Sequence, residues 1–169
     1  WLRKIWKGPL LIKGILHPEE AKQAVALGVD GVIVSNHGGR QLDGAVPALE
    51  ALPDIVEAVA GKIPVLVDGG FRRGSHVVKA LCLGAACCLV ARPQLWGLAI
   101  GGEAGVAHVL DIFRREIDRS MALMGAFCDP DAPRFQSGLP PVTIGSLTRM
   151  INLRKKIADG TATPSEIQE

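Results

Sequence analysis

The stretch IPVLVDGGFRRGS, residues 63–75, decides the fold. Its first six residues are almost continuously apolar and rich in valine, which is typical of a strand covered on both faces in a parallel sheet. Glycines and arginines follow at once, and residues 74–84 then carry a helical pattern with Ser75 as its expected N-cap. A buried strand, a glycine-rich turn and a helix in this order predict a βα unit of a parallel α/β protein.

Three further apolar runs of the same kind stand along the chain. The expected strands are 9–14, 30–35, 63–68 and 86–91, and the expected helices are 17–28, 46–61, 74–84 and 103–125. Pro53 should divide the second helix, because proline removes a hydrogen bond from a helix interior. The order βαβαβαβα fits either an open doubly wound sheet or part of a (β/α)₈ barrel.

The composition is that of one globular domain. The 169 residues are 48% hydrophobic and 21% charged, and the formal net charge of +2 argues against a nucleic-acid partner. The longest apolar run, residues 80–91, is shorter than the roughly 20 residues of a membrane-spanning helix, and the first residues lack a signal-peptide pattern. Four cysteines without a C-x-x-C pair predict buried, reduced thiols and a cytoplasmic protein. We assign no metal site.

Polar, basic and glycine residues gather where the four expected strands end. They are Lys13 in the first strand, Ser35, His37 and Arg40 after the second, Asp68, Gly69, Gly70, Phe71 and Arg72 after the third, and Ala91 and Arg92 after the fourth. The carboxyl ends of parallel strands lie on one rim, which carries the active site in such folds. We therefore expect these residues to form one site.

The turn at 68–74 predicts a phosphate site. Its glycines let backbone N–H groups approach an anion, the helix that follows adds the positive end of its dipole, and Arg72 can bind phosphate oxygens. The ARP segment at 91–93 strengthens this interpretation, because barrel phosphate sites are commonly built after strands 7 and 8. The four strands would then be strands 5–8, and we expect the N-terminal half of the barrel to lie outside this sequence.

Three side chains on this rim suggest acid–base and anion chemistry. An unperturbed histidine, with a pKa of about 6.5, can accept a proton at neutral pH, which makes His37 a candidate base. Arg40 could hold a substrate carboxylate while His37 acts on the adjacent carbon. Lys13, a cation in an apolar strand, should face an anion or an electron-rich ring, and Ser35 could contact a cofactor ring or cap its strand.

The segments IKG (12–14), SNHGGRQLD (35–43), DGGFRRG (68–74) and ARP (91–93) together closely resemble the FMN-dependent α-hydroxy acid oxidase/dehydrogenase family. The resemblance covers about residues 1–128. It implies the C-terminal half of a TIM barrel that uses FMN to oxidise an L-2-hydroxy acid to a 2-keto acid. By this resemblance His37 is the catalytic base and Arg40 binds the substrate carboxylate. The flavin contacts are Lys13 and Ser35, and the ribityl chain and phosphate contacts are Asp68, Gly69, Gly70, Phe71, Arg72, Ala91 and Arg92.

The chain departs from the family pattern in three places. The family uses two tyrosines, a second arginine and a histidine-orienting acid from the first half of the barrel, whereas this chain has no tyrosine. Ala91 stands where the family usually has glycine. Residues 129–169 fit the pattern poorly and read as a loop-rich tail with one helix at 147–160.

The resemblance further implies a homotetramer for a complete protein, and some relatives associate peripherally with membranes. Two other readings of the chain stay open. It could be a catalytically inactive half-barrel, or it could belong to another class of FMN-binding or phosphate-binding barrel enzyme.

Overall fold

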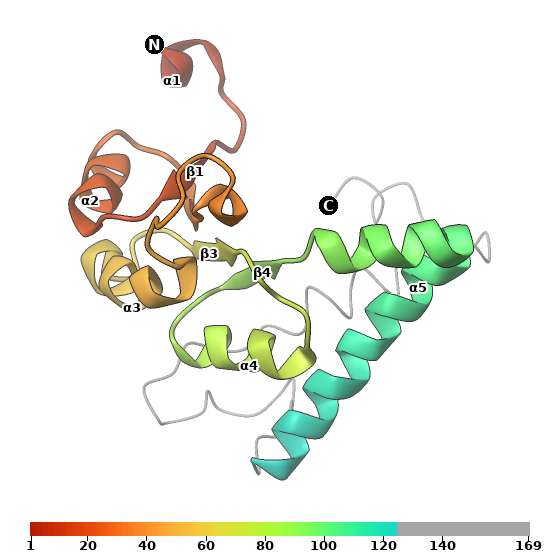
Figure 1. Cartoon of the computed structure of the whole chain (residues 1–169). Coiled ribbons are helices and arrows are strands. Elements are labelled where there is room, and N and C mark those ends of the chain that lie inside the picture. Colours follow the sequence, from red (N-terminus) through yellow and green to blue (C-terminus); the bar gives the residue numbers. More distant parts are fainter. Residues whose placement is uncertain (125–169) are drawn as a thin grey trace, which may run out of the picture.

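A computed structural model describes residues 1–124, so the expected tail at 129–169 and its helix lie outside the described residues. The elements, in chain order, are α1 (Leu2–Ile5), β1 (Leu11–Ile15), α2 (Pro18–Ala26), β2 (Gly31–Val34), the 3₁₀ turn η1 (His37–Gly39), α3 (Ala48–Val59), β3 (Val65–Asp68), α4 (Gly74–Cys82), β4 (Cys87–Leu89) and α5 (Arg92–Leu123) (Figure 1). The predicted βα repeat is confirmed, and each strand end lies within two residues of its expected position.

The four strands form one parallel sheet in the order β1-β2-β3-β4. Each crossover advances to the next strand in the same direction, and right-handed crossovers of this kind place all the helices on one face. On that face α2 packs beside α3, and α4 packs beside α5 (Figure 1). The strand order has no reversal point, so the doubly wound alternative does not describe residues 1–124.

The two faces of the sheet differ in burial. Val32, Val34, Val65 and Val67 are buried against the helices, while the alternate positions, such as Leu66, are only half-buried. The continuous apolar runs predicted cover on both faces, but the described residues cover one. The half-covered face is the one that carries the site, because Leu66 and Asp68 project to the same side of β3.

Two local predictions about helices were wrong. α3 runs without a break through Pro53, because Leu52 and Ile55 on either side of it are fully buried and tertiary packing holds the helix together. α4 begins at Gly74 without a cap from Ser75. Instead, the Gly74 N–H donates to Oε2 of Glu116 at 2.6 Å, so a carboxylate from α5 caps this helix.

The last helix consists of two segments that fold back on each other. Gly101 and Gly102 have non-helical backbone angles and join the segments, and the second segment packs along α4 (Figure 1). The segments cross at Gly97 and Gly105, where a Cβ on Gly97 would lie 2.5 Å from the Gly105 carbonyl oxygen. Within residues 1–124 no helix is long and apolar enough to span a membrane.

Candidate active site

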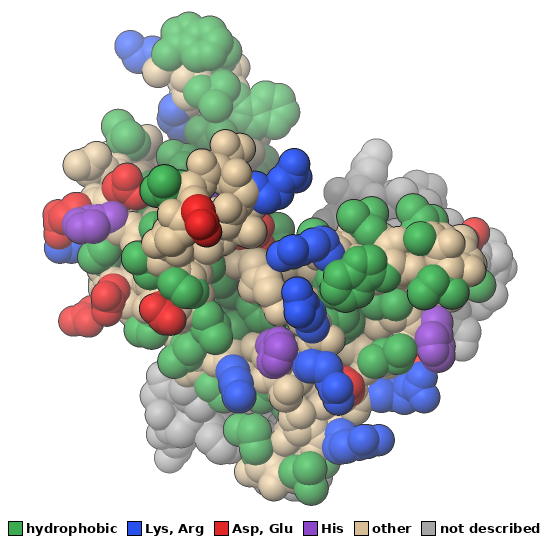
Figure 2. Space-filling view, viewed as in Figure 1, with side chains coloured by type: hydrophobic (Ala, Val, Ile, Leu, Met, Phe, Trp, Pro, Cys, Tyr) green, Lys and Arg blue, Asp and Glu red, His purple; other side chains and the backbone are tan. Residues whose placement is uncertain are grey.

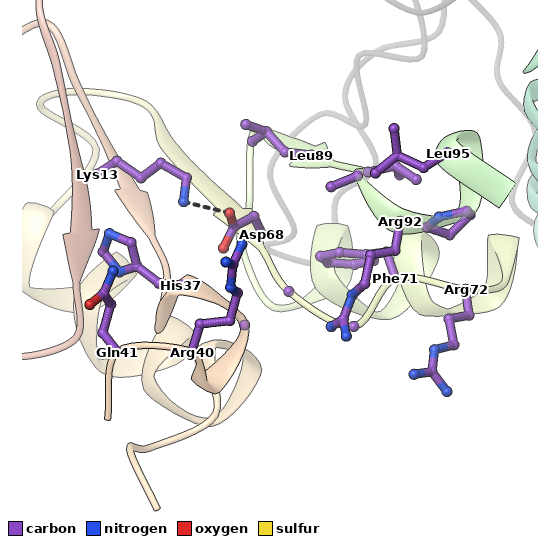
Figure 3. Close-up of a pocket in the computed structure, with 16 residues that line it drawn as sticks. Lys13, His37, Arg40, Gln41, Asp68, Phe71, Arg72, Leu89, Arg92 and Leu95 are labelled. Atoms are coloured by element: carbon purple, nitrogen blue, oxygen red, sulfur yellow. Dashed lines mark ion pairs between the residues drawn. The ribbon is translucent and has the colours of Figure 1, made fainter. Parts of the chain in front are cut away.

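A cavity of about 640 Å³ opens at the carboxyl ends of the strands (Figure 3). Small-molecule sites in proteins commonly measure roughly 300–1,000 Å³. The sequence-predicted residues on its wall are Lys13, His37, Arg40, Asp68, Gly69, Gly70, Phe71, Arg72, Ala91 and Arg92. The structure thus brings together every site residue expected from the sequence except Ser35, which lies behind the wall.

Lys13, on the cavity wall, is the centre of a cluster of polar side chains. Its Nζ lies 2.7 Å from Oδ2 of Asp68 and donates to Oγ of Ser35 at 2.9 Å. The anion that faces Lys13 is therefore a carboxylate from β3, two strands away. A register shift between Lys13 and Ile15 interrupts the regular ladder of β1 at this point.

Ser35 connects Lys13 to the loop that carries His37. Its Oγ accepts the lysine hydrogen bond and also accepts one from the His37 backbone N–H at 3.1 Å. The residue is 1% exposed and does not line the cavity. The structure gives Ser35 a role in holding two cavity residues, and its direct contact with a flavin stays a prediction.

The loop after β2 is shaped by its own side chains. Oδ1 of Asn36 accepts from the Gly38 N–H at 3.0 Å, and its amide donates to the Val46 carbonyl at 3.4 Å. The sequence analysis assigned no role to Asn36, although an asparagine two residues before a glycine is the usual signal of such a side-chain turn. In Figure 3 His37 and Arg40 extend from this loop to the side of the cavity that holds Lys13 and Asp68.

The opposite wall is basic. Arg92 follows β4, and a Cβ on Gly38 would lie 3.7 Å from its Nη2, so the arginine reaches across toward the loop after β2. The guanidinium of Arg72 lies 5.9 Å from the centre of the Trp96 ring. Figure 2 shows basic side chains gathered between the sheet and α5. Among the described residues that line the cavity, Asp68 is the only acidic one, so this part of the site attracts anions.

The start of α4, where an anion contact was predicted, already holds a carboxylate of the chain itself. Glu116 already binds the Gly74 N–H and pairs with Nε of Arg73 at 2.9 Å, so a carboxylate holds this helix end. The hydrogen bond from Gly74, followed by the charge of Arg73, lowers the pKa of Glu116. The start of α5 is different, because Arg92 and Pro93 in its first turn line the cavity.

Beside the polar groups, the cavity has an apolar wall that the sequence analysis missed. It is formed by Leu89, Val90, Pro93 and Leu95, with Gln41 on the side of the loop after β2. The sequence indicates these residues only by their position, since each lies within a few residues of a strand end or of a predicted site residue. An apolar wall suits a flat aromatic ring system.

Burial disfavours the thiolate form of two cysteines in β4. Cys82, Cys87 and Cys88 are free thiols and only half-buried, whereas full burial was expected. Burial raises the pKa of the Cys87 thiol, and it raises that of Cys88 to about 12. Neither group therefore forms a thiolate at neutral pH.

Comparison with known proteins identifies the family. Residues 1–128 match the family model of the FMN-dependent dehydrogenases. The chain belongs to this family. Its members' shared dependence on FMN agrees with a cavity that attracts anions and has one apolar wall.

Several relatives are close in sequence. The chain is 54% identical over 125 residues to an L-lactate oxidase of Nostoc sp. and equally to 2-hydroxyacid oxidase 1 of Mus musculus, with 74% of this chain and 34% of each relative covered. A crystal structure of mandelate oxidase with benzoyl-formic acid superposes with a TM-score of 0.72 at 50% identity, covering 74% of this chain and 37% of that one. The chain thus spans about a third of the length of the curated relatives it matches.

Proposed function

We propose that the complete protein uses FMN to oxidise an L-2-hydroxy acid to the corresponding 2-keto acid. The observation that carries this proposal is the convergence of His37, Arg40 and Lys13 on one cavity. The relatives named for L-lactate and 2-hydroxy acid oxidation support the substrate class. The cavity supplies a base, a carboxylate-binding group and a positive charge held by an ion pair with Asp68.

The residues present fit FMN on three counts. Arg72 and Arg92 offer charge to a phosphate, and Gly69 and Gly70 have φ angles of +104° and +75° that leave the backbone open to close approach. Oδ1 of Asp68 is buried without a hydrogen-bond partner among residues 1–124 and suits a ribityl hydroxyl donor. We assign the phosphate to Arg72, Arg92 and the backbone at Ala91, and the flavin ring to the side of Lys13.

The proposed chemistry is divided among three side chains. Arg40 binds the substrate carboxylate through two charge-assisted hydrogen bonds and so orients Cα. His37 accepts one proton, taken either from Cα or from the hydroxyl group. Bound FMN supplies the acceptor for the two electrons that leave the substrate. Lys13, held by Asp68 and Ser35, places positive charge where negative charge accumulates.

We further propose that the four βα units are strands 5–8 of a (β/α)₈ barrel. Sequential strand order, helices on one face and a half-covered second face support this assignment. Within residues 1–124 the outer edges of β1 and β4 have no strand partner, and a closed barrel would pair both. The free thiols of Cys82, Cys87 and Cys88 are compatible with a cytoplasmic protein, and a homotetramer stays our expectation for the complete protein.

Anaerobic bleaching of flavin absorbance tests the proposed function. The complete protein, loaded with FMN, should bleach on addition of glycolate, L-lactate or L-mandelate. His37→Ala should slow the bleaching about 10²–10⁴-fold, while His108→Ala, at an exposed position of α5, should leave it unchanged. A bound flavin that no 2-hydroxy acid reduces, or unaltered bleaching in His37→Ala, would overturn the proposal.

A further inference from the structure

We propose that Gly14 is a positioning residue for His37, because its missing side chain leaves the space that the imidazole occupies. The inference rests on the proposed function in one respect, the role of His37 as the base. The contact between the two residues is a property of the fold and can be measured without turnover.

The backbone at Gly14 is unusual in two ways. Its φ of +104° is a conformation that residues with a Cβ rarely adopt. It also lies inside the register shift between Lys13 and Ile15, where β1 departs from its regular pairing with β2. Irregularities of this kind are frequent beside active sites, where they redirect a side chain. Here the irregularity follows directly after Lys13.

The imidazole of His37 packs against this bare backbone. A Cβ on Gly14 would lie 2.9 Å from Cε1 of His37, closer than real Cβ atoms approach another carbon. It would lie 3.7 Å from Nδ1 and 3.8 Å from Nε2, so the Cε1 corner of the ring faces the strand. Both nitrogens flank that corner and lie farther from the strand than Cε1 does. Any side chain at position 14 would push the ring out of this place.

The main chain of His37 is held by Ser35, which follows β2 and which Lys13 of β1 also contacts. Its N–H donates to Oγ of Ser35 at 3.1 Å, and the same oxygen accepts from Nζ of Lys13 at 2.9 Å. His37 itself has a left-handed φ of 56°, which fixes the direction in which its side chain leaves the loop. Two consecutive residues of β1 therefore help to locate the histidine: Lys13 through Ser35 and the His37 backbone N–H, and Gly14 through its contact with the His37 ring.

The experiment compares Gly14→Ala with Gly28→Ala. Gly28 also has a positive φ, +75°, but a Cβ there meets nothing within 4 Å, so it reproduces the backbone strain without the contact. In the FMN-loaded protein with ¹³Cε1-labelled histidine, the His37 signal is assigned by its loss in His37→Ala. We expect a nuclear Overhauser effect between His37 Hε1 and the Gly14 Hα protons. Gly14→Ala should shift the His37 resonance, and Gly28→Ala should not.

Turnover supplies a second readout. Displacing a reacting group by about 1 Å costs about 10²-fold in rate, so Gly14→Ala should lower kcat/KM by that order. It should also move the acid limb of the kcat/KM pH profile, because the ring would change its distance from Lys13, Asp68 and Arg40, the charged groups around the cavity on its side. A substitution that only strained the backbone would leave the position of that limb unchanged, as we expect of Gly28→Ala.

A double-variant cycle protects the test against poor folding. If the ring and the new methyl group compete for space, Gly14→Ala should destabilise the fold more when His37 is present. The rise in the unfolding equilibrium constant should then be about tenfold larger than in the His37→Ala background. Recovery of folding in the double variant would likewise support the inference. The inference would be overturned if the His37 resonance did not move in folded Gly14→Ala, or if the effects of the two substitutions on stability were simply additive. It would also be overturned if Gly14→Ala failed to fold and the double variant did not recover folding. Normal turnover in His37→Ala would instead overturn the proposed base and leave the measured contact intact.

Discussion

Asp68 and Lys13 form an ion pair of 2.7 Å between β3 and β1, and only one carboxylate oxygen takes part in it. The other oxygen, Oδ1, is buried and has no hydrogen-bond partner among residues 1–124. An unpaired buried acceptor costs about 1–3 kcal/mol. The site is therefore prepared for a ligand that brings a donor to this oxygen, and the hydroxyl groups of the FMN ribityl chain meet that requirement.

Removing the ammonium group should weaken FMN binding. In Lys13→Met, Asp68 loses its counter-ion and the cavity loses the charge proposed to face the flavin. The loss of a hydrogen bond to a charged group, about 1.5–3 kcal/mol, corresponds to about a 10–100-fold rise in Kd. Titration of FMN with the protein, followed by quenching of flavin fluorescence, measures this. Lys22→Met is the control, since Lys22 pairs with exposed Glu19 on α2, and equal Kd values in both variants would contradict the proposal.

Substitution of Arg40 should act on the substrate and spare the cofactor. Arg40→Lys keeps the positive charge but loses the planar pair of donors, so KM for a 2-hydroxy acid should rise by about tenfold or more while the Kd of FMN stays unchanged. Steady-state kinetics with L-lactate checks the first expectation. Arg114→Ala, on the exposed side of α5, serves as the control. A rise in the Kd of FMN without a change in KM would show that Arg40 binds the cofactor and not the substrate.

The positions of the site residues were predictable because they depend on one regular feature. Apolar runs located the four strands, and parallel strands place their carboxyl ends on one rim. Lys13, His37, Asp68 and Arg92 are separated by many residues, yet this rule alone brought them to one cavity. Pattern and spacing were sufficient wherever the fold repeats a βα unit.

Contacts between distant elements were not predictable in the same way. Glu116 caps α4 from 42 residues away along the chain, and nothing in the sequence of residues 74–84 predicts this contact. Pro53 was expected to divide α3, and only the burial of its neighbours shows why the helix continues. The role of Gly14 depends on where the His37 ring comes to lie. Each of these depends on tertiary packing, which periodicity does not encode.

The carboxylate of Glu116 should make stability depend on pH. Its pKa is lowered from the ordinary value of 4.5 by the Gly74 N–H and Arg73, so its contribution is complete above that value and disappears as pH falls through the lowered folded-state pKa. We expect Glu116→Gln to cost about 1 kcal/mol at pH 7, the typical value of a helix cap. Urea unfolding should show this difference shrinking as the pH falls below 4.5.

Glu103→Gln is the matched control for that experiment, because Glu103 is an exposed carboxylate of the same helix. Its substitution should change stability little, and by a similar amount at both ends of the pH range. The free energy of unfolding of Glu116→Gln is compared with that of the unsubstituted protein. If the difference between them were constant with pH, the carboxylate charge would not stabilise the start of α4.

The crossing of the two segments of α5 should be intolerant of even one methyl group. A Cβ on Gly105 would meet the carbonyl oxygen of Gly97, and neither backbone can move without shifting the first segment, which carries Arg92 into the cavity. Overpacking of this kind costs about 1–3 kcal/mol. Gly105→Ala should therefore lower the urea midpoint and also weaken FMN binding.

Gly101→Ala tests the specificity of the effect, because a Cβ there meets nothing within 4 Å and its φ is negative. If both variants lost equal stability, helix propensity and not the close crossing would explain the loss; if Gly105→Ala unfolded early but bound FMN normally, the crossing would be independent of Arg92.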